Sequence, residues 1–229
     1  MLGIIPARGG SKGIPKKNIV PVGGRPLIAW TIEPALAALA KGVFHDLVVS
    51  TDSEEIASVA RDLGAKVPGL RPARISGDRA KSLDAILFEI ARCRSEGVEF
   101  TSVMLLQPTS PLRTREDIEA AAARFTAGGA PSLISGYREP TISDLLMYRR
   151  EGDVAVPLNP DHNRGVRRQD QDPIFVRNGA IYVTSVEYLE SEGRIISDRP
   201  LLHEMPKRRS LNLDTAEDMA LLEAVLATR

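Results

Sequence analysis

The sequence predicts an α/β fold around a mostly parallel β-sheet. Between residues 1 and 135, short apolar runs alternate with amphipathic stretches, and this alternation is typical of strand-helix-strand units. The chain has 229 residues, 43% of them hydrophobic and 26% charged, which suits one globular domain with a substantial core. We therefore expect a single domain over residues 1–229.

Strands and helices follow one another through the first part of the chain. We expect strands at residues 2–5, 46–50, 66–68, 102–106 and 132–135, and helices at residues 26–40, 53–63, 83–94 and from 114 onward. Pro34 should kink the first helix. Ser53 is a suitable N-cap and Gly64 a suitable terminator for the second helix, while Thr114 and Asp117 form a capping box.

Residues 137–177 differ in character, with several prolines, many charges and little helical periodicity. A strand pair is possible at residues 145–149 and 154–156. We expect this segment to leave the sheet as an inserted arm that covers the active site or reaches a second subunit. Regular patterning resumes with a strand at residues 181–184 and a final helix capped by Thr215 and Asp218.

Composition narrows the possible partners. Thirty basic and thirty acidic side chains give a formal net charge of zero, and aromatic residues make up 4% of the chain, so we expect no nucleic-acid partner. Cys93 is the single cysteine, which excludes an intrachain disulfide. No window reaches the roughly 18 apolar residues that span a bilayer, and no charged leader precedes an apolar run. We expect no membrane contact and a cytoplasmic protein.

A cationic, glycine-rich loop directly follows the first predicted strand. It reads RGGSKGIPKKN from Arg8 to Asn18. At the carboxyl end of a strand in an α/β sheet, glycines let backbone amides approach phosphate while Arg and Lys neutralise it. The spacing matches neither the Walker A pattern nor GxGxxG. The loop predicts a triphosphate site; the alternative is a solvated basic turn.

Three further segments carry candidate site residues. Gln107 follows a predicted strand in the rigid loop QPTSPLR, where it can orient a polar substrate. Asn178 and Tyr182, in RNGAIY, are a weak signal, since a tight turn and an ordinary strand aromatic explain them equally well. Asn212 and Asp214 alternate along an extended segment and so share a face, which suits Mg²⁺ or Mn²⁺. The alternative is that Asp214 merely precedes a helix cap.

Together these segments resemble the acylneuraminate cytidylyltransferases, the CMP-sialic acid synthetases. The resemblance covers residues 2–226 and rests on ARGGSKGIPKKN, on Arg71-Pro72 followed by Asp78, and on LLQPTSPLR, RNGAIY and LDTAED. It implies the Rossmann-like sheet of the nucleotide-diphospho-sugar transferases and a homodimer in which residues 137–177 reach the partner subunit. It also implies CTP and a nonulosonic acid as substrates.

The resemblance further implies roles for individual residues. Those at the CTP phosphates, ribose and base would be Arg8, Gly10, Ser11, Lys12, Lys17, Asn18, Arg71 and Ser82. Those at the sugar would be Gln107, Arg168, Asn178 and Tyr182, with Arg168 acting across the dimer. The catalytic set would be Arg8, Lys17, Gln107 and Asp214, and the metal ligands would be Asp214 and Asn212.

One departure from the family concerns the metal site. The family usually presents two aspartates where this chain has Asn212-Leu213-Asp214, which removes one negative charge. The implied reaction is in-line attack of the sugar C2 hydroxyl on the α-phosphorus of CTP, catalysed by positioning and electrostatics. Alternatives are a cytidylyltransferase for KDN, legionaminic, pseudaminic or KDO acid, a metal-dependent glycosyltransferase, and a non-catalytic nucleotide-binding module.

Overall fold

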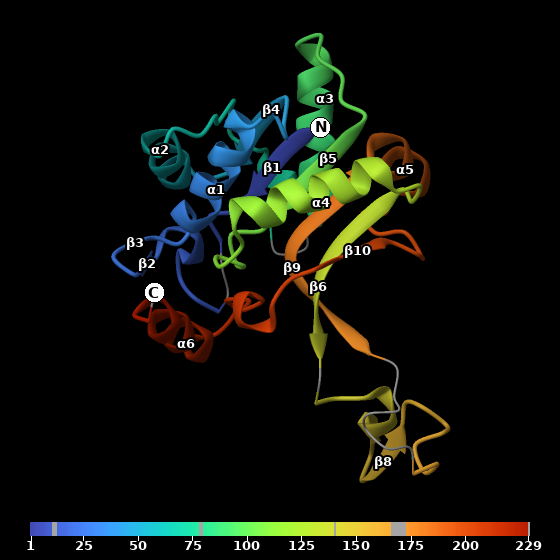
Figure 1. Ribbon diagram of the computed structural model, residues 1–229. Helices are drawn as coiled ribbons and strands as arrows, with labels where there is room; N and C mark the ends of the chain where they lie inside the picture. Colours follow the sequence, from blue (N-terminus) through green and yellow to red (C-terminus); the bar gives the residue numbers. More distant parts are fainter. Residues whose placement is uncertain (11–12, 78–79, 140, 166–172, 229) are drawn as a thin grey trace.

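A six-stranded sheet forms the centre of the computed structural model, which describes residues 1–10, 13–77, 80–139, 141–165 and 173–228 (Figure 1). Strand β9 runs antiparallel to both of its neighbours, and the other pairings are parallel, so the prediction of a mostly parallel sheet is confirmed. The strand order is β10 (Leu201–Glu204), β6 (Ser132–Glu139), β9 (Ile174–Ser185), β5 (Ser102–Leu106), β1 (Leu2–Pro6) and β4 (Asp46–Ser50).

Helices cover both faces of this sheet. One face packs against α1 (Ala29–Ala40), α2 (Glu54–Asp62) and α4 (Arg115–Ala127). The other packs against α3 (Ser82–Ser95) and α5 (Val186–Glu192). Strands covered on both faces are apolar almost throughout, and every residue of β5 is buried. This double cover explains why the inner strands read as continuous hydrophobic runs in the sequence.

Local capping signals identified the start of several helices correctly. The Ser53 hydroxyl accepts from the Ile56 amide at the start of α2. Thr114 and Asp117 form the predicted capping box of α4, and Thr215 forms one with Asp218 before α6 (Ala216–Leu226). These caps depend on residues three positions apart, so they can be recognised without knowledge of the tertiary structure.

Two element predictions were wrong, one at its boundary and one in kind. Helix α1 begins at Ala29 instead of residue 26, because the amides of Leu27 and Ile28 donate to the carbonyls of Val20 and Asn18. The preceding residues form a small antiparallel pair, β2 (Pro21–Val22) with β3 (Arg25–Pro26). The strand expected at residues 66–68 is only an isolated bridge between Lys66 and Val48.

Several elements are longer than expected or were not predicted. Strands β6 and β9 extend well beyond the predicted residues 132–135 and 181–184. Helix α5 and strand β10 were missed, because each is short and carries only a brief pattern. The short 3-10 helices were also not predicted; they are η1 (Lys17–Ile19), η2 (Ala73–Ile75), η3 (Asp144–Leu146) and η5 (Lys207–Arg209).

A protruding arm leaves the sheet through β6 and β9. Residues Gly136–Glu139 of β6 pair with Ile174–Arg177 of β9 as a two-stranded ribbon, which Figure 1 shows running away from the body. At its end lies a hairpin of β7 (Tyr148–Glu151) and β8 (Val154–Pro157). The first strand is displaced by two to three residues from the expected 145–149, and the second agrees with the expected 154–156 to within one residue. Contact between this arm and a second subunit stays a prediction.

In the described part of the chain, every helix is too short or too polar to cross a membrane.

Candidate functional site

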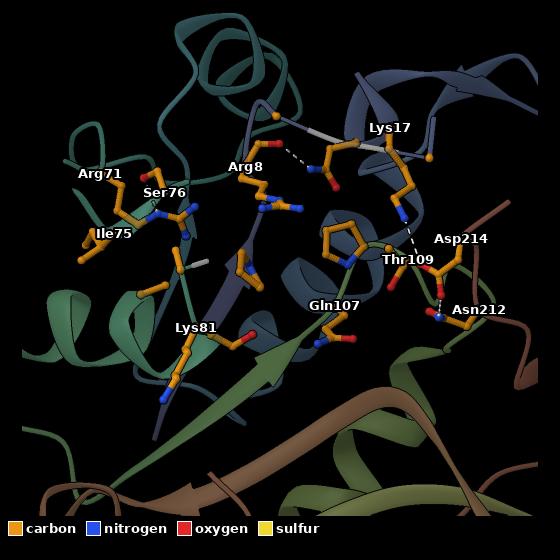
Figure 2. A pocket seen from close by; sticks show the side chains of 18 residues that line it. Arg8, Lys17, Arg71, Ile75, Ser76, Lys81, Gln107, Thr109, Asn212 and Asp214 are labelled. Carbon is orange, nitrogen blue, oxygen red and sulfur yellow. Dashed lines mark hydrogen bonds and ion pairs between the residues drawn. The ribbon is translucent and has the colours of Figure 1, made fainter. Parts of the chain in front are cut away.

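A pocket of about 610 Å³ opens where β1 and β5 end and where α3 begins. The carboxyl ends of parallel strands are the usual ligand sites of such sheets. Figure 2 shows side chains from four separate parts of the chain converging on it. The described residues that line it are Pro6, Arg8, Gly10, Gly13, Lys17, Asn18, Arg71, Ile75, Ser76, Ala80, Lys81, Ser82, Ala85, Gln107, Pro108, Thr109, Asn212 and Asp214.

The cationic loop after β1 is held in place by its own polar contacts. The Gly9 amide donates to Asp52 Oδ1 at 2.8 Å, and Asn18 Nδ2 donates to the Arg8 carbonyl at 2.9 Å. Arg8 Nη1 donates to the Gly77 carbonyl at 3.2 Å. Lys16 adopts a left-handed φ of 51°, which is uncommon outside glycine. The loop is therefore fixed at both ends, and Arg8 faces the pocket.

The loop also contacts the segment before α6, far away in the sequence. Lys17 Nζ donates to the Leu213 carbonyl at 2.9 Å and to Asp214 Oδ1 at 3.0 Å. A Cβ at Gly13 would lie 2.6 Å from the Asp214 carbonyl oxygen, so only glycine permits this approach. The structure thus places the predicted phosphate loop and the predicted metal residues side by side.

Asn212 and Asp214 share one side of their segment, although the segment is not a strand as expected. A single bond from the Leu213 amide to the Thr109 carbonyl, 2.7 Å long, replaces a sheet ladder. Leu213 is fully buried, and Asn212 Nδ2 donates to the Asp214 carboxylate. Asn212 Oδ1 is buried and finds no hydrogen-bond partner among the described residues.

These oxygens suit a hard cation, whose preferred ligands are carboxylate and amide oxygens. The buried, unpartnered Asn212 Oδ1 is the observation that favours this fit, because such atoms are costly when unpaired. The described residues contain no cluster of three or more His, Cys, Asp or Glu side chains placed to bind a metal. The two residues therefore suit a shared site, in which a substrate supplies further oxygens.

The wall opposite Asp214 is built around a buried arginine (Figure 2). Arg71 is 7% exposed, and its Nε donates to Ser76 Oγ at 3.3 Å. Burial lowers the pKa of Arg71, while the nearby carboxylates of Asp52 and Glu89 oppose that shift. Ser82 begins α3, whose N-terminal amides favour electron-rich groups. The guanidinium of Arg71 and the first amides of α3 thus present hydrogen-bond donors to the pocket in a fixed arrangement.

Gln107 lies at the end of β5 beside a positive-φ glycine of β9. Gly179 has a φ of +75°, and a Cβ there would be 3.1 Å from Gln107 Oε1 and 3.8 Å from Tyr182 Oη. Asn178-Gly179 is thus a kink within β9, near an irregularity in its pairing with β6, and not a tight turn between strands. Tyr182 lies near Gln107, and burial raises the pKa of its hydroxyl.

Asn178 has a structural role, in contrast to the predicted sugar contact. It is 5% exposed. Its Oδ1 accepts from Ser135 Oγ at 2.6 Å and from the Ala180 amide at 3.1 Å. Its Nδ2 donates to Ser210 Oγ at 2.9 Å and to Met205 Sδ at 3.3 Å. The side-chain amide is fully used in joining β6, β9 and the segment after β10.

The predicted site residues fall into three groups. Those that line the pocket are Arg8, Gly10, Lys17, Asn18, Arg71, Ser82, Gln107, Asn212 and Asp214. Tyr182 and Asn178 are not among the described residues that line it, and Ser11, Lys12 and Arg168 fall outside the described residues. Lys81, Ser76 and Thr109 were not predicted. A signal existed only for Lys81, a cation two residues before the predicted helix 83–94; the other two are common loop residues.

Comparison with known proteins assigns the family. Residues 2–192 match the family described as Cytidylyltransferase. The chain belongs to the cytidylyltransferase family. It is therefore a nucleotidyltransferase, and the resemblance seen in the sequence motifs is confirmed.

Curated relatives share about one third of their residues with this chain. A pseudaminic acid cytidylyltransferase of Campylobacter jejuni (strain 81-176) is 33% identical, over 94% of this chain and 91% of its own length. A CMP-N,N'-diacetyllegionaminic acid synthase of Legionella pneumophila is 33% identical, over 99% of this chain and 96% of its own. An N-acylneuraminate cytidylyltransferase of Streptococcus agalactiae serotype V is also 33% identical over 94% of this chain, which spans only 50% of that protein.

Solved structures support the fold. A CMP:2-keto-3-deoxy-manno-octonic acid synthetase complexed with CTP superimposes with a TM-score of 0.72 at 17% identity, covering 99% of this chain and 98% of that one. A 4-diphosphocytidyl-2C-methyl-D-erythritol synthase gives a TM-score of 0.69 at 14% identity, covering 98% and 97%. The Rossmann-like architecture of the nucleotidyltransferases is therefore confirmed for this chain.

Proposed function

We propose that this cytidylyltransferase joins CTP to a nonulosonic acid, giving the CMP-sugar and pyrophosphate. The relatives that match nearly their full length act on pseudaminic acid and on diacetyllegionaminic acid according to their names. The observation that carries the proposal is the junction of Lys17 with Asp214 at one pocket. That junction combines a cationic phosphate loop with an acidic residue, as triphosphate chemistry requires.

The nucleotide would lie along the pocket from Arg71 to Lys17. Arg71 and the start of α3 offer donors to the acceptor atoms of cytosine, which are an oxygen and a ring nitrogen. The loop that contains Gly10 would bind the phosphates through its backbone amides. Arg8 would contribute positive charge beside them. In this arrangement, Lys17 lies where the β- and γ-phosphates would depart.

The reaction would be a displacement at the α-phosphorus of CTP. The C2 hydroxyl oxygen of the sugar would form the new bond to phosphorus as its proton passes to water, and the bond from phosphorus to the oxygen bridging the β-phosphate would break. Negative charge collects on that oxygen, where Lys17 and Arg8 would stabilise it. Removal of one such contact commonly costs about 2.7–4 kcal/mol of transition-state stabilisation. Gln107 would orient the sugar for in-line attack.

A magnesium or manganese ion fits the residues on the Asp214 side. Asp214 would supply a carboxylate oxygen and Asn212 its buried, otherwise unpaired Oδ1. Bound there, the ion would supply positive charge to the phosphate oxygens. With Asn in place of the usual Asp, this chain gives the ion one fewer negative charge and relies more on the triphosphate itself.

We also propose a cytoplasmic homodimer joined through the arm. The tip of the arm exposes apolar side chains, including Leu146 at 65% and Val154 at 61%. Such surface is costly in water and typical of protein contacts.

The proposal is tested by incubation of the chain with CTP and magnesium against Neu5Ac, KDN, legionaminic acid, pseudaminic acid and KDO. We expect pyrophosphate release and a CMP-sugar with at least one of the nine-carbon acids. In a parallel incubation with a nucleotide-sugar donor, release of free CMP or of a nucleoside diphosphate would indicate a glycosyltransferase instead. Lack of turnover in both the parent and Asn212→Asp would favour a non-catalytic nucleotide-binding module.

A further inference from the structure

A buried carboxylate at the start of α4 takes no part in the proposed chemistry. Asp117 is 5% exposed, and its Oδ2 accepts from the Thr114 amide at 2.9 Å. Arg209 donates two hydrogen bonds to this carboxylate. Its Nη1 donates to Oδ2, and its Nη2 donates to Oδ1 at 3.0 Å. Burial opposes the charge of Asp117, but its contacts with His203, Arg209 and Thr114 hold its pKa below the usual range.

Arg209 belongs to the segment that carries the predicted metal residues. It ends η5, and the chain then passes Ser210, whose Oγ accepts from the buried Asn178 amide at 2.9 Å. The segment next makes the 2.7 Å bond from the Leu213 amide to the Thr109 carbonyl. The Arg209 pair and the Leu213 bond thus secure the segment on either side of Asn212.

The partners of these anchors lie on one continuous stretch that starts at Gln107. Thr109 and Asp117 belong to this stretch, and so does Arg113, which is 2% exposed. Arg113 Nη1 donates to the Ala180 carbonyl at 2.6 Å and to the Gln107 carbonyl at 3.4 Å. Burial lowers the pKa of Arg113 to about 9, against the opposing charge of Asp117. Asp117 therefore faces cations from two directions.

We propose that Arg209, held by Asp117, is a positioning residue that fixes Asn212 and Asp214 relative to Gln107. The described residues that line the pocket include neither Arg209 nor Asp117, so the pair would act only through the segment it anchors. The effect that we expect on kcat rests on the proposed function. Small misplacements of groups around a reacting centre can cost about 10²-fold in rate. Loss of the contact between Arg209 and Asp117 should therefore lower the rate measurably.

A purely structural role is the competing explanation. In that case the pair would only stabilise the N-terminus of α4 and the fold around it. Loss of Arg209 would then lower the melting temperature without a selective effect on the pocket. Figure 2 shows Arg71 on the far side of the pocket from Asn212 and Asp214. A positioning role therefore predicts that base recognition survives while turnover does not.

The test compares the full-length parent with Arg209→Ala. We expect amide exchange at Leu213 to become about tenfold faster, because local opening releases its bond to Thr109. With substrates and magnesium at saturation, kcat should fall by about 10²-fold, while the KM for CTP stays within roughly threefold, since Arg71 and its wall are untouched. Asp117→Asn should likewise make amide exchange at Leu213 faster and lower kcat.

Two further variants provide rescue and control. Arg209→Lys keeps the charge but loses the planar two-point contact, so its kcat should lie between those of Arg209→Ala and the parent. If Arg209→Ala does not fold, Arg209→Lys replaces it as the test variant. Arg94→Ala is the matched control, because Arg94 makes the same two-point contact with Glu190 in an exposed position between α3 and α5. Its kcat and its exchange at Leu213 should equal those of the parent.

Unchanged exchange at Leu213 in Arg209→Ala, or a kcat within twofold of the parent, would overturn the proposal. So would a loss of activity in Arg94→Ala equal to that in Arg209→Ala. If the parent makes no CMP-sugar, the proposed function fails, and the exchange at Leu213 alone decides whether Arg209 fixes the segment. The two failures are therefore distinguishable.

Discussion

The body of the molecule and its arm obtain their stability in opposite ways. Every residue of β5 in the body is buried, whereas every residue of β7 in the arm is exposed. The described, exposed large apolar residues gather mainly on the arm and its ribbon, namely Ile142, Leu146, Met147, Tyr148, Val154, Leu158, Phe175 and Val176. The body is held by its own core, while the arm exposes apolar surface of the kind that is common at protein contacts.

The two regions meet at an ionic contact. Glu139, at the root of the arm, accepts from Lys207 Nζ at 2.7 Å and from the Thr141 amide at 2.9 Å. These contacts lower the pKa of Glu139 to about 2. Lys207 also lies 5.7 Å from the centre of the Tyr137 ring. These polar contacts tie the first residues of the arm to the segment after β10.

The sharpest test of this difference compares one leucine from each region. Leu106 is fully buried and Leu146 is 65% exposed. Leu106→Ala should lower the free energy of unfolding by about 2–5 kcal/mol, because it leaves a cavity in the core. Leu146→Ala should change it by less than about 0.5 kcal/mol. Urea unfolding of both variants at a concentration that keeps the chain monomeric measures this, and equal losses would contradict the comparison.

Catalysis should depend on the body, and above all on Lys17. Lys17→Ala should reduce turnover by about 10²–10³-fold, because it removes charge beside the departing phosphates. Its effect on unfolding should be far smaller. Lys16→Ala is the control, since Lys16 pairs with the exposed Glu55 at 2.8 Å instead of facing the pocket. Pyrophosphate release and thermal unfolding of both variants decide the matter; similar turnover would exclude a special role for Lys17.

The anchor at Asp117 should make the stability of the body depend on pH. Because the pKa of Asp117 is lowered in the folded state, its charge stabilises the protein above the ordinary value of 3.8, and this contribution is lost as pH falls toward the folded pKa. Asp117→Asn should cost about 1.5–3 kcal/mol at pH 7. The difference between parent and variant in urea unfolding should shrink at pH 3. A difference independent of pH would exclude the charge as its cause.

Self-association should depend on the arm. Leu146→Asp places a charge on the exposed apolar surface and should weaken a dimer about tenfold, typical of a moderate interface residue. Sedimentation across a range of concentrations measures this. Leu221→Asp is the control, because Leu221 is 52% exposed on α6, away from the arm. Equal weakening by both variants would show that the arm is not the interface.

The smallest effect is expected at the metal side of the pocket. Asn212→Asp adds a negative charge to the proposed metal site and should preserve or raise turnover by a few-fold, while lowering the magnesium concentration for half-maximal rate. Titration of the rate with magnesium for parent and variant tests this. A clear fall in activity would mean that the amide of Asn212 contributes more than an oxygen ligand.

Local signals in the sequence predicted much of the body. DLVVS and SVMLL form strands with the expected bounds, since runs of apolar residues covered on both faces need no further context. The capping boxes of α4 and α6 are equally local. The start of α1 was missed because it depends on hydrogen bonds from Leu27 and Ile28 back to the loop before them, which no periodicity reveals.

The site was predictable where a chemical group follows a strand. Arg8 and Gln107 lie at strand ends and line the pocket. Asn178 was assigned to the sugar, but the fold uses its amide to join distant segments. No sequence pattern indicated that Arg209 pairs with Asp117, because Asp117 lies on α4, well before it in the chain. Contacts of this kind depend on topology and not on any short pattern.

The junction between Lys17 and Asp214 has a consequence for synthesis of the chain. These residues are 197 positions apart, so at typical translation speeds roughly 10–40 s pass between their appearance. During that time Lys17 lacks the carboxylate with which it pairs in the folded chain. The positive charge of Lys17 is therefore balanced by Asp214 only late in translation.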